Sequence, residues 1–116
     1  MQIRKIYKEI NPELLYHEIR DFTQKQGATI GETKIETYSL PSDSSSFVSC
    51  GILTFKIGDQ QENAEKKCLR AHILGSAKTE TKVILDIDEK LFPEQKVSAL
   101  QDDLDFIFGS YEAQPR

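Results

Sequence analysis

The C-terminal part of the chain contains the stretch around which the fold is organised. Residues 93–111 read PEQKVSALQDDLDFIFGSY. Apolar side chains recur there at the spacing of one helix face, at Val97, Leu100, Leu104, Ile107, Phe108 and Tyr111. Pro93 suits the first position of a helix and Gly109 suits its end. At a rise of about 1.5 Å per residue, this helix is roughly 24 Å long, which is enough to cross a small sheet.

The composition indicates one folded domain that needs neither a metal ion nor a disulfide. The chain has 116 residues, of which 38% are hydrophobic, and this length allows a core of its own. The net charge of -4 lacks the basic excess that is typical of proteins that bind nucleic acid or anionic membranes. No export signal and no apolar run of roughly 20 residues is present. We therefore expect a cytoplasmic protein without nucleic-acid or membrane partners, in which Cys50 and Cys68 are reduced.

Residues 1–27 predict a strand followed by a helix. The isoleucines of residues 1–10 also fit a helical spacing, but the break at Asn11-Pro12 favours a strand. Asn11 is a good N-cap and Pro12 a good first residue, so the helix should cover residues 12–26 and end before Gly27. Its predicted buried stripe comprises Leu15, Ile19 and Phe22, with Leu14 beside it.

Residues 34–88 predict four strands. The first covers residues 34–40 and the second residues 47–57, with a polar turn at 42–46 between them and a charged loop at 58–66 after them. In the second strand the odd-numbered residues Phe47, Ser49, Gly51, Leu53, Phe55 and Ile57 share one face. The last two strands form a hairpin, since both carry apolar residues at alternate, odd-numbered positions.

The parity of that hairpin predicts its register. Both apolar sets face inward only if the numbers of paired residues add to an even value, because directly opposite residues share a face. The turn is then centred near Lys78, and Arg70 lies opposite Asp86. The same rule applied to the preceding loop pairs Ile57 with Leu69 around Asn63.

These elements predict a two-layer α+β sandwich of order β-α-β-β-β-β-α, in which both helices cover one face of an antiparallel sheet. Residues 1–111 would form this single domain and residues 112–116 a flexible tail. The helix of residues 93–108 would lie on the odd-numbered face of residues 47–57.

No residue pattern indicates a catalytic or metal centre. Cys68 and His72 are four residues apart, and on a strand this separates them by about 13 Å, so they cannot share one ion. The serines of residues 44–46 lack a neighbouring base, and the acidic residues of the last helix form an ordinary solvated face. We expect no metal and no cofactor, and the absence of a combined nucleophile, base and orienting group favours a non-enzymatic role.

Small residues interrupt the row of bulky side chains on the odd-numbered face of the strand predicted at residues 47–57. Ser49 and Gly51 leave space beneath the helix that crosses them. Either the helix comes closer there, or Gly51 marks a bulge, or a cavity remains between sheet and helix. Closer approach is the favoured interpretation.

The order of elements resembles the helix-grip fold of the START, Bet v 1 and polyketide-cyclase-like families. A strand precedes a helix that opens with Ile10-Asn11-Pro12-Glu13-Leu14-Leu15-Tyr16, and a meander and one long final helix follow. The resemblance covers nearly the whole chain as topology, although this chain has fewer strands, no short second helix and no Trp. It implies a small pocket for an apolar or amphipathic ligand, lined by Ser49, Gly51, Phe55, Leu104 and Phe108. Fold alone assigns no ligand.

An alternative hypothesis assigns the function to the other face of the sheet. The apolar residues that alternate outward are Val48, Cys50, Ile52 and Ile84. A contiguous apolar surface of this kind is typical of a protein-interaction site. The protein would then be a homodimer or an acidic adaptor of chaperone-like type.

Overall fold

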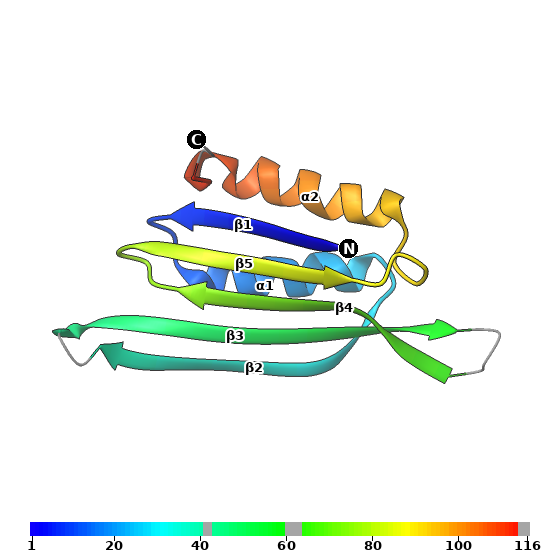
Figure 1. Ribbon diagram of the computed structural model, residues 1–116, viewed down its shortest axis with the longest axis horizontal. Coiled ribbons are helices and arrows are strands. Elements are labelled where there is room, and N and C mark those ends of the chain that lie inside the picture. Colours follow the sequence, from blue (N-terminus) through cyan, green and yellow to red (C-terminus); the bar gives the residue numbers. More distant parts are fainter. Residues whose placement is uncertain (41–42, 60–63, 114–116) are drawn as a thin grey trace.

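The computed structural model describes residues 1–40, 43–59 and 64–113, and it has five antiparallel strands with two helices on one face (Figure 1). The strands are β1 (Gln2–Lys8), β2 (Thr29–Leu40), β3 (Asp43–Asp59), β4 (Ala64–Gly75) and β5 (Glu80–Ile87). The helices are α1 (Pro12–Lys25) and α2 (Glu94–Phe108), and the short 3-10 helix η1 (Gly109–Tyr111) follows α2. The order in the sheet is β1-β5-β4-β3-β2. The predicted α+β class and order of elements are confirmed.

Helix α1 begins and ends where the sequence predicts. Asn11 Oδ1 accepts a hydrogen bond from the Glu13 backbone N–H at 2.9 Å, and Pro12 occupies the first turn. Gly27 follows the helix with a φ of 98°, in the left-handed region that glycine adopts at little cost. These end contacts fix the direction in which α1 crosses the sheet.

The strand register agrees with the predicted parity in the β4–β5 hairpin but not at the loop end of the β3–β4 pair, where Ile57 pairs with Lys66. β4 and β5 form a hairpin centred on Lys78, in which Arg70 pairs with Asp86. Between β3 and β4, Phe55 pairs with Leu69, and a bulge follows. The expected pairing of Ile57 with Leu69 is therefore wrong by two positions.

Strands β3 and β4 extend into segments that were predicted as turns. β3 begins at Asp43 and continues to Asp59, and β4 begins at Ala64. Residues 43–46 are therefore strand rather than turn, while residues 41–42 and 60–63 of the predicted turn and loop lie outside the described part of the chain. Asp43 pairs with Leu40, and residues 44–46 fall within an irregularity of the β2–β3 register.

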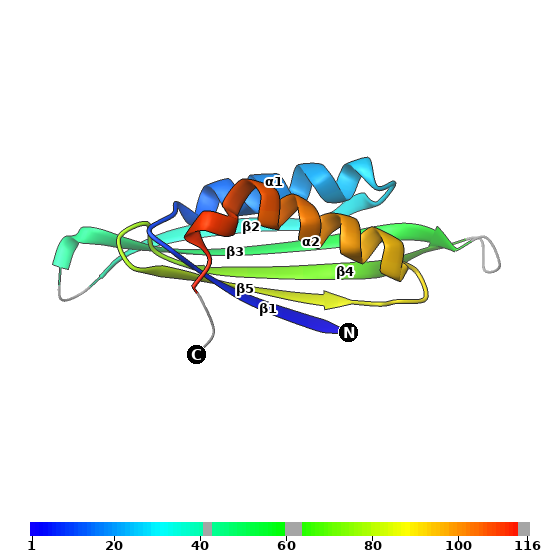
Figure 2. The same ribbon diagram turned by 90° about the horizontal axis from the view of Figure 1, so that it is seen from above.

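The core lies between the odd-numbered face of the sheet and the two helices, as Figure 2 shows. Its fully buried strand residues include Leu53, Phe55, Ala71, Val83 and Leu85. Helix α1 packs against β3, β4 and β2. Helix α2 lies beside α1 at the β1 edge, where the rings of Phe108 and Tyr7 meet edge to face at 6.2 Å.

Helix α2 buries a narrower stripe than its sequence predicts. Val97, Leu100, Leu104 and Phe108 are buried. Ile107 and Tyr111 are 41% and 46% exposed, so their predicted burial is wrong. The helix ends at Phe108 near the border of the sheet, and Tyr111 belongs to η1.

The C-terminal residues contact the first strand. The backbone N–H of Ala113 donates to the Ile6 carbonyl at 2.7 Å, and Glu112 forms a β-bridge with Tyr7. Lys5 Nζ reaches both Glu112 and Asp105 at 3.0 Å. Residues 112 and 113, expected in the tail, therefore lie along β1, and residues 114–116 lie outside the described part of the chain.

Gly51 permits a close contact between β3 and α1. A Cβ atom at this position would lie 2.7 Å from Cδ2 of Tyr16, which is closer than packed atoms approach. The expectation that the last helix crosses Gly51 is wrong, because the first helix lies there. The favoured interpretation of the small residue, a helix in close approach, holds for α1.

We predict that Gly51→Ala destabilises the protein by about 1–3 kcal/mol, since the Tyr16 ring must shift from its packed position. Urea denaturation measures this change in the free energy of unfolding. Gly58→Ala is the matched control, because no atom lies within 4 Å of the added Cβ. Equal stability of the two variants would contradict the packing described here.

Candidate functional site

The sheet face turned away from the helices carries an apolar stripe that crosses several strands. Figure 1 looks onto this face, with α1 behind the strands. Ile52 of β3 pairs with His72 of β4, which pairs with Ile84 of β5. Val48 and Cys50 precede Ile52 at alternate positions of β3. The structure thus brings the four residues expected in a partner site onto one surface, and all four are half-buried.

Three further apolar residues lie on the same surface and were missed in the sequence. Leu74, which pairs with Cys50, is 49% exposed, and Tyr38, which pairs with Val48, is 54% exposed. Ile6 of β1 is 37% exposed and pairs with Lys82, the neighbour of Leu74. Their even numbers suggest the outward face, but only the pairing of β1, β2 and β4 with their neighbours places them beside the predicted set. We call the whole set the outer apolar patch: Ile6, Tyr38, Val48, Cys50, Ile52, Leu74 and Ile84.

The patch departs from the usual pattern of an exposed sheet. An antiparallel sheet with one solvated face normally alternates apolar residues inward with polar residues outward. β3 instead carries Val48, Cys50 and Ile52 at three successive outward positions. Both described helices lie on the other face of the sheet.

Charge is distributed unequally between the two faces. The two rows of paired residues that contain Ile52 and Leu74 also contain the cations Arg4, Lys34 and Lys82 and a single carboxylate, Glu36. Helices α1 and α2 together carry seven acidic and three basic residues. The helix layer is therefore acidic, while the outer apolar patch has a slightly basic border.

The residues expected around a ligand cavity do not surround one space. Phe55 and Leu104 are fully buried in the core, and Gly51 lies beneath Tyr16. Phe108 contacts Tyr7 on β1. Two strands separate β1 from β3, which corresponds to about 14 Å across the sheet.

Ser49, the remaining residue of that set, lies at an open hollow near the start of α1. Its Oγ and that of Thr37 are 3.1 Å apart and share a hydrogen bond. The hollow has a volume of about 240 Å³ and is also lined by Phe47 and Lys78. The first helical N–H groups there are already bonded to Asn11, so no free donors face the hollow from the capped turn.

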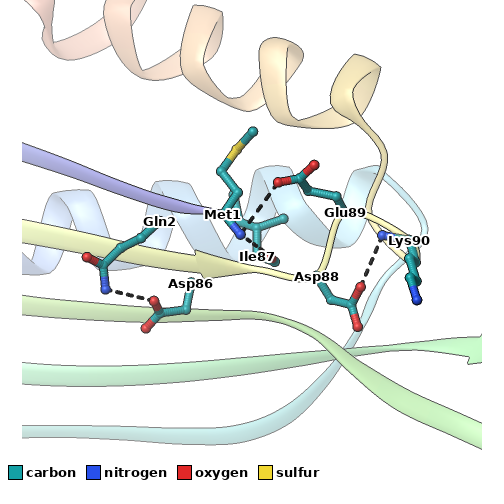
Figure 3. Close-up of polar contacts among 7 residues, drawn as sticks. All are labelled: Met1, Gln2, Asp86, Ile87, Asp88, Glu89 and Lys90. Carbon is teal, nitrogen blue, oxygen red and sulfur yellow. Dashed lines mark hydrogen bonds and ion pairs between the residues drawn. The ribbon is translucent and has the colours of Figure 1, made fainter.

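A second hollow lies where β1, β4 and β5 end, and Figure 3 shows the polar residues beside it. Its volume is about 420 Å³, and Arg70, Asp86 and Asp88 contribute to its lining. Asp86 accepts a hydrogen bond from Gln2 Nε2 at 2.9 Å, and Asp88 accepts from the Lys90 backbone N–H at 3.0 Å. Both carboxylates thus have neighbouring donors within the fold.

The titratable groups of the core are held in unreactive forms. Burial raises the pKa of the Cys68 thiol and raises that of Tyr7 to about 12. Burial disfavours the charged form of Lys5, but its hydrogen bonds to Glu112 and Asp105 outweigh this and raise its pKa. Within the described residues, no three His, Cys, Asp or Glu side chains form a metal-binding group. Neither described helix has the length and apolar character of a membrane span.

One pair of carboxyl groups joins the two helices. A hydrogen bond to Asp103 of α2, together with burial and the charge of Asp103, raises the pKa of Glu18 of α1 to about 7. Two ionised carboxylates cannot form this bond. Asp103 Oδ2 is buried and accepts no hydrogen bond from the described residues, so a proton on Glu18 is the donor that it lacks. A proton held by Glu18 thus favours this contact between the helices.

We predict that this pair makes the protein less stable as pH rises from about 4.5 to about 7. A raised pKa means that the folded state binds the proton more tightly than the unfolded state. The contribution of the pair to the free energy of unfolding is therefore complete below the pKa of Glu18 in the unfolded chain and is lost above its pKa in the folded protein. Glu18→Gln retains a donor for Asp103. At pH 8 this variant should be more stable than wild type by about 1 kcal/mol, because the partly exposed pair is screened.

Urea denaturation at pH 4.5 and pH 8 measures the difference, which should disappear at the lower pH. Asp102→Asn is the control, because Asp102 is the exposed neighbour of Asp103 on α2. Glu18→Gln and Asp102→Asn with the same pH dependence would contradict a shared proton.

Comparison with known proteins adds no family to this geometry. No protein-family model, no curated protein and no solved structure matches the chain. The function therefore has to follow from the outer apolar patch, the two hollows and the charge of each face.

Proposed function

We propose that the protein is a non-enzymatic interaction module whose outer sheet face binds an acidic amphipathic helix of a partner protein. The observation that carries this proposal is the run of outward apolar residues Val48, Cys50 and Ile52 on β3. With Leu74 and Ile84 beside it, this run forms a surface across neighbouring strands. The partner helix would add a third layer to the fold.

Burial of the apolar side chains favours a packed helix rather than solvent on this face. Sheets in α/β proteins commonly bury both faces against helices, and an amphipathic helix presents one apolar stripe. Leu74 and Tyr38 are each about half exposed. Complete burial of such a side chain stabilises a complex by about 1 kcal/mol.

The charge of the border specifies the partner's chemistry. Arg4 and Lys34 lie at the two ends of the row that contains Ile52 and Ile84, and Lys82 lies in the next row. Glutamate or aspartate on the flanks of the partner helix would meet these cations. Such complementarity accelerates association and selects against basic partners.

The hypothesis of a small apolar ligand receives less support from the packing. Tyr16 fills the space above Gly51, and Phe55 and Leu104 have no exposed surface. An enzymatic role likewise lacks a set of activated groups, since Tyr7 and Cys68 remain protonated.

Two synthetic amphipathic peptides of about 18 residues, identical in their leucine stripe, test the proposal. One carries Glu on its flanks and the other Lys. The Glu peptide should shift the amide resonances of Ile52, Leu74 and Ile84 and leave those of α1 unchanged. The Lys peptide should bind at least tenfold more weakly, because Arg4 and Lys34 repel it.

Matched variants separate this surface from the helix layer. Ile52→Asp places a charge within the outer apolar patch and should abolish binding of the Glu peptide. Phe106→Asp makes a comparable change on α2, where Phe106 is 90% exposed, and should leave binding intact. Equal binding of both peptides, or shifts confined to α1 and α2, would overturn the proposal.

A further inference from the structure

The two edges of the sheet differ in how they are covered. At the β1 edge, Ala113 donates to Ile6 and Glu112 forms a bridge with Tyr7. At the opposite edge, β2 is the last strand in the order, and no strand of the described ranges pairs with its outer side. Figure 1 shows β2 outermost, with α1 behind the inner strands rather than beyond this edge. A strand of twelve residues is therefore sterically open to another chain.

The exposed edge carries opposite charges two residues apart. Lys34 and Glu36 lie on the outer face, with Nζ and Oε1 3.0 Å apart and side chains 57% and 42% exposed. Ile35 lies between them on the inner face and is 39% exposed. Edge charges of one sign prevent pairing with a second copy, whereas this arrangement permits it in a particular register.

That register places Ile35 opposite its own equivalent in an antiparallel pair. Lys34 then lies opposite Glu36 twice, and Thr33 lies opposite Thr37 twice. Pairs of opposite charge and pairs of threonines both stabilise antiparallel strands.

Neighbouring registers are disfavoured by charge or by geometry. A shift of two residues in one direction places Lys34 opposite Lys34 and Glu32 opposite Glu36, and the other direction places Glu36 opposite Glu36. A shift of one residue pairs outward with inward side chains, so the helices of the second copy would lie on the opposite face. The sequence of β2 thus selects the register centred on Ile35.

We infer that two copies of this chain associate through antiparallel β2 strands, about a twofold axis at Ile35. The five strands of each copy then form one continuous sheet, with all helices on one face. The two outer apolar patches become neighbours on the other face. This inference depends on the edge strand alone and is independent of the proposed partner helix.

The expected affinity follows from the small size of the contact. Pairing along one strand buries a smaller accessible surface than a standard stable interface, which buries at least about 1,200 Å². We therefore expect a monomer–dimer equilibrium with a Kd of about 10 μM, an affinity between those of transient and permanent complexes. Sedimentation equilibrium over roughly 1–300 μM covers this range, and the dimer has twice the 13.2 kDa mass of the chain.

Charge reversal at the edge tests the pairing directly. Lys34→Glu and Glu36→Lys each create like-charge pairs across the axis and should raise the dimer Kd at least tenfold. The double variant K34E/E36K restores opposite charges and should recover the wild-type Kd. Lys90→Glu, an equal charge change at an exposed position after β5, is the control and should leave the Kd unchanged.

Cysteine cross-linking tests the register. In a Cys50→Ser background, with Cys68 buried, Ile35→Cys should form a disulfide-linked dimer when diamide is added as the oxidant. Thr33→Cys and Thr37→Cys should not cross-link separately, but a mixture of the two should. This pattern follows from the pairing of residue 33 with residue 37.

A wild-type protein that stays monomeric up to about 300 μM would overturn the inference, given the Kd expected for this contact area. So would a double variant that fails to recover after both single variants weaken the dimer. Cross-linking of Thr33→Cys with itself would equally contradict the register. Peptide binding is measured independently of dimerisation, because its reporters Ile52 and Ile84 lie on β3 and β5 rather than on β2.

Discussion

The packing of both helices on the odd-numbered face of the sheet is the constraint on which the rest of the structure depends. Because side chains alternate along a strand, this packing sends the even-numbered residues of 48–52, 70–74 and 82–86 to the opposite face. Tyr16 above Gly51 and Phe108 against Tyr7 hold the two helices in place at different strands. The core is thereby completed on one side, and Ile52, Leu74 and Ile84 lie on the other.

This division also separates charge. Acidic residues gather on α1 and α2, where Glu18 and Asp103 come close enough to share a proton. The two rows of paired residues that contain Ile52 and Leu74 carry three cations and one carboxylate. An acidic chain with a basic-bordered apolar face would discriminate between partners by charge as well as by shape. Pairing of β2 strands would place two such faces side by side.

Much of the fold could be predicted because parity and helix caps are local signals. The hairpin around Lys78 and the start of α1 at Asn11 follow from a few residues each. The strand character of residues 43–46 could not be read, because Ser and Asp favour turns and the pairing of Asp43 with Leu40 is not visible in the sequence. Nor does the apolar stripe of α2 reveal which strands it covers, so its position over β1 was missed.

The candidate surface was only partly predictable for the same reason. Val48, Cys50 and Ile52 belong to one strand, and their alternation is visible in the sequence. Leu74 and Ile6 required the register of β4 and β1 to be placed beside them. The complementarity of Lys34 and Glu36 acquires its meaning only when β2 is known to be an edge strand.

The alkylation rate of the Cys50 thiol tests the central claim most directly, because Cys50 lies within the outer apolar patch and Cys68 is buried. The rate should fall at least tenfold when the Glu-flanked amphipathic peptide is present at saturation, and it should not change with the Lys-flanked peptide. An unchanged rate under conditions where the Glu peptide binds would place the partner elsewhere and contradict the account.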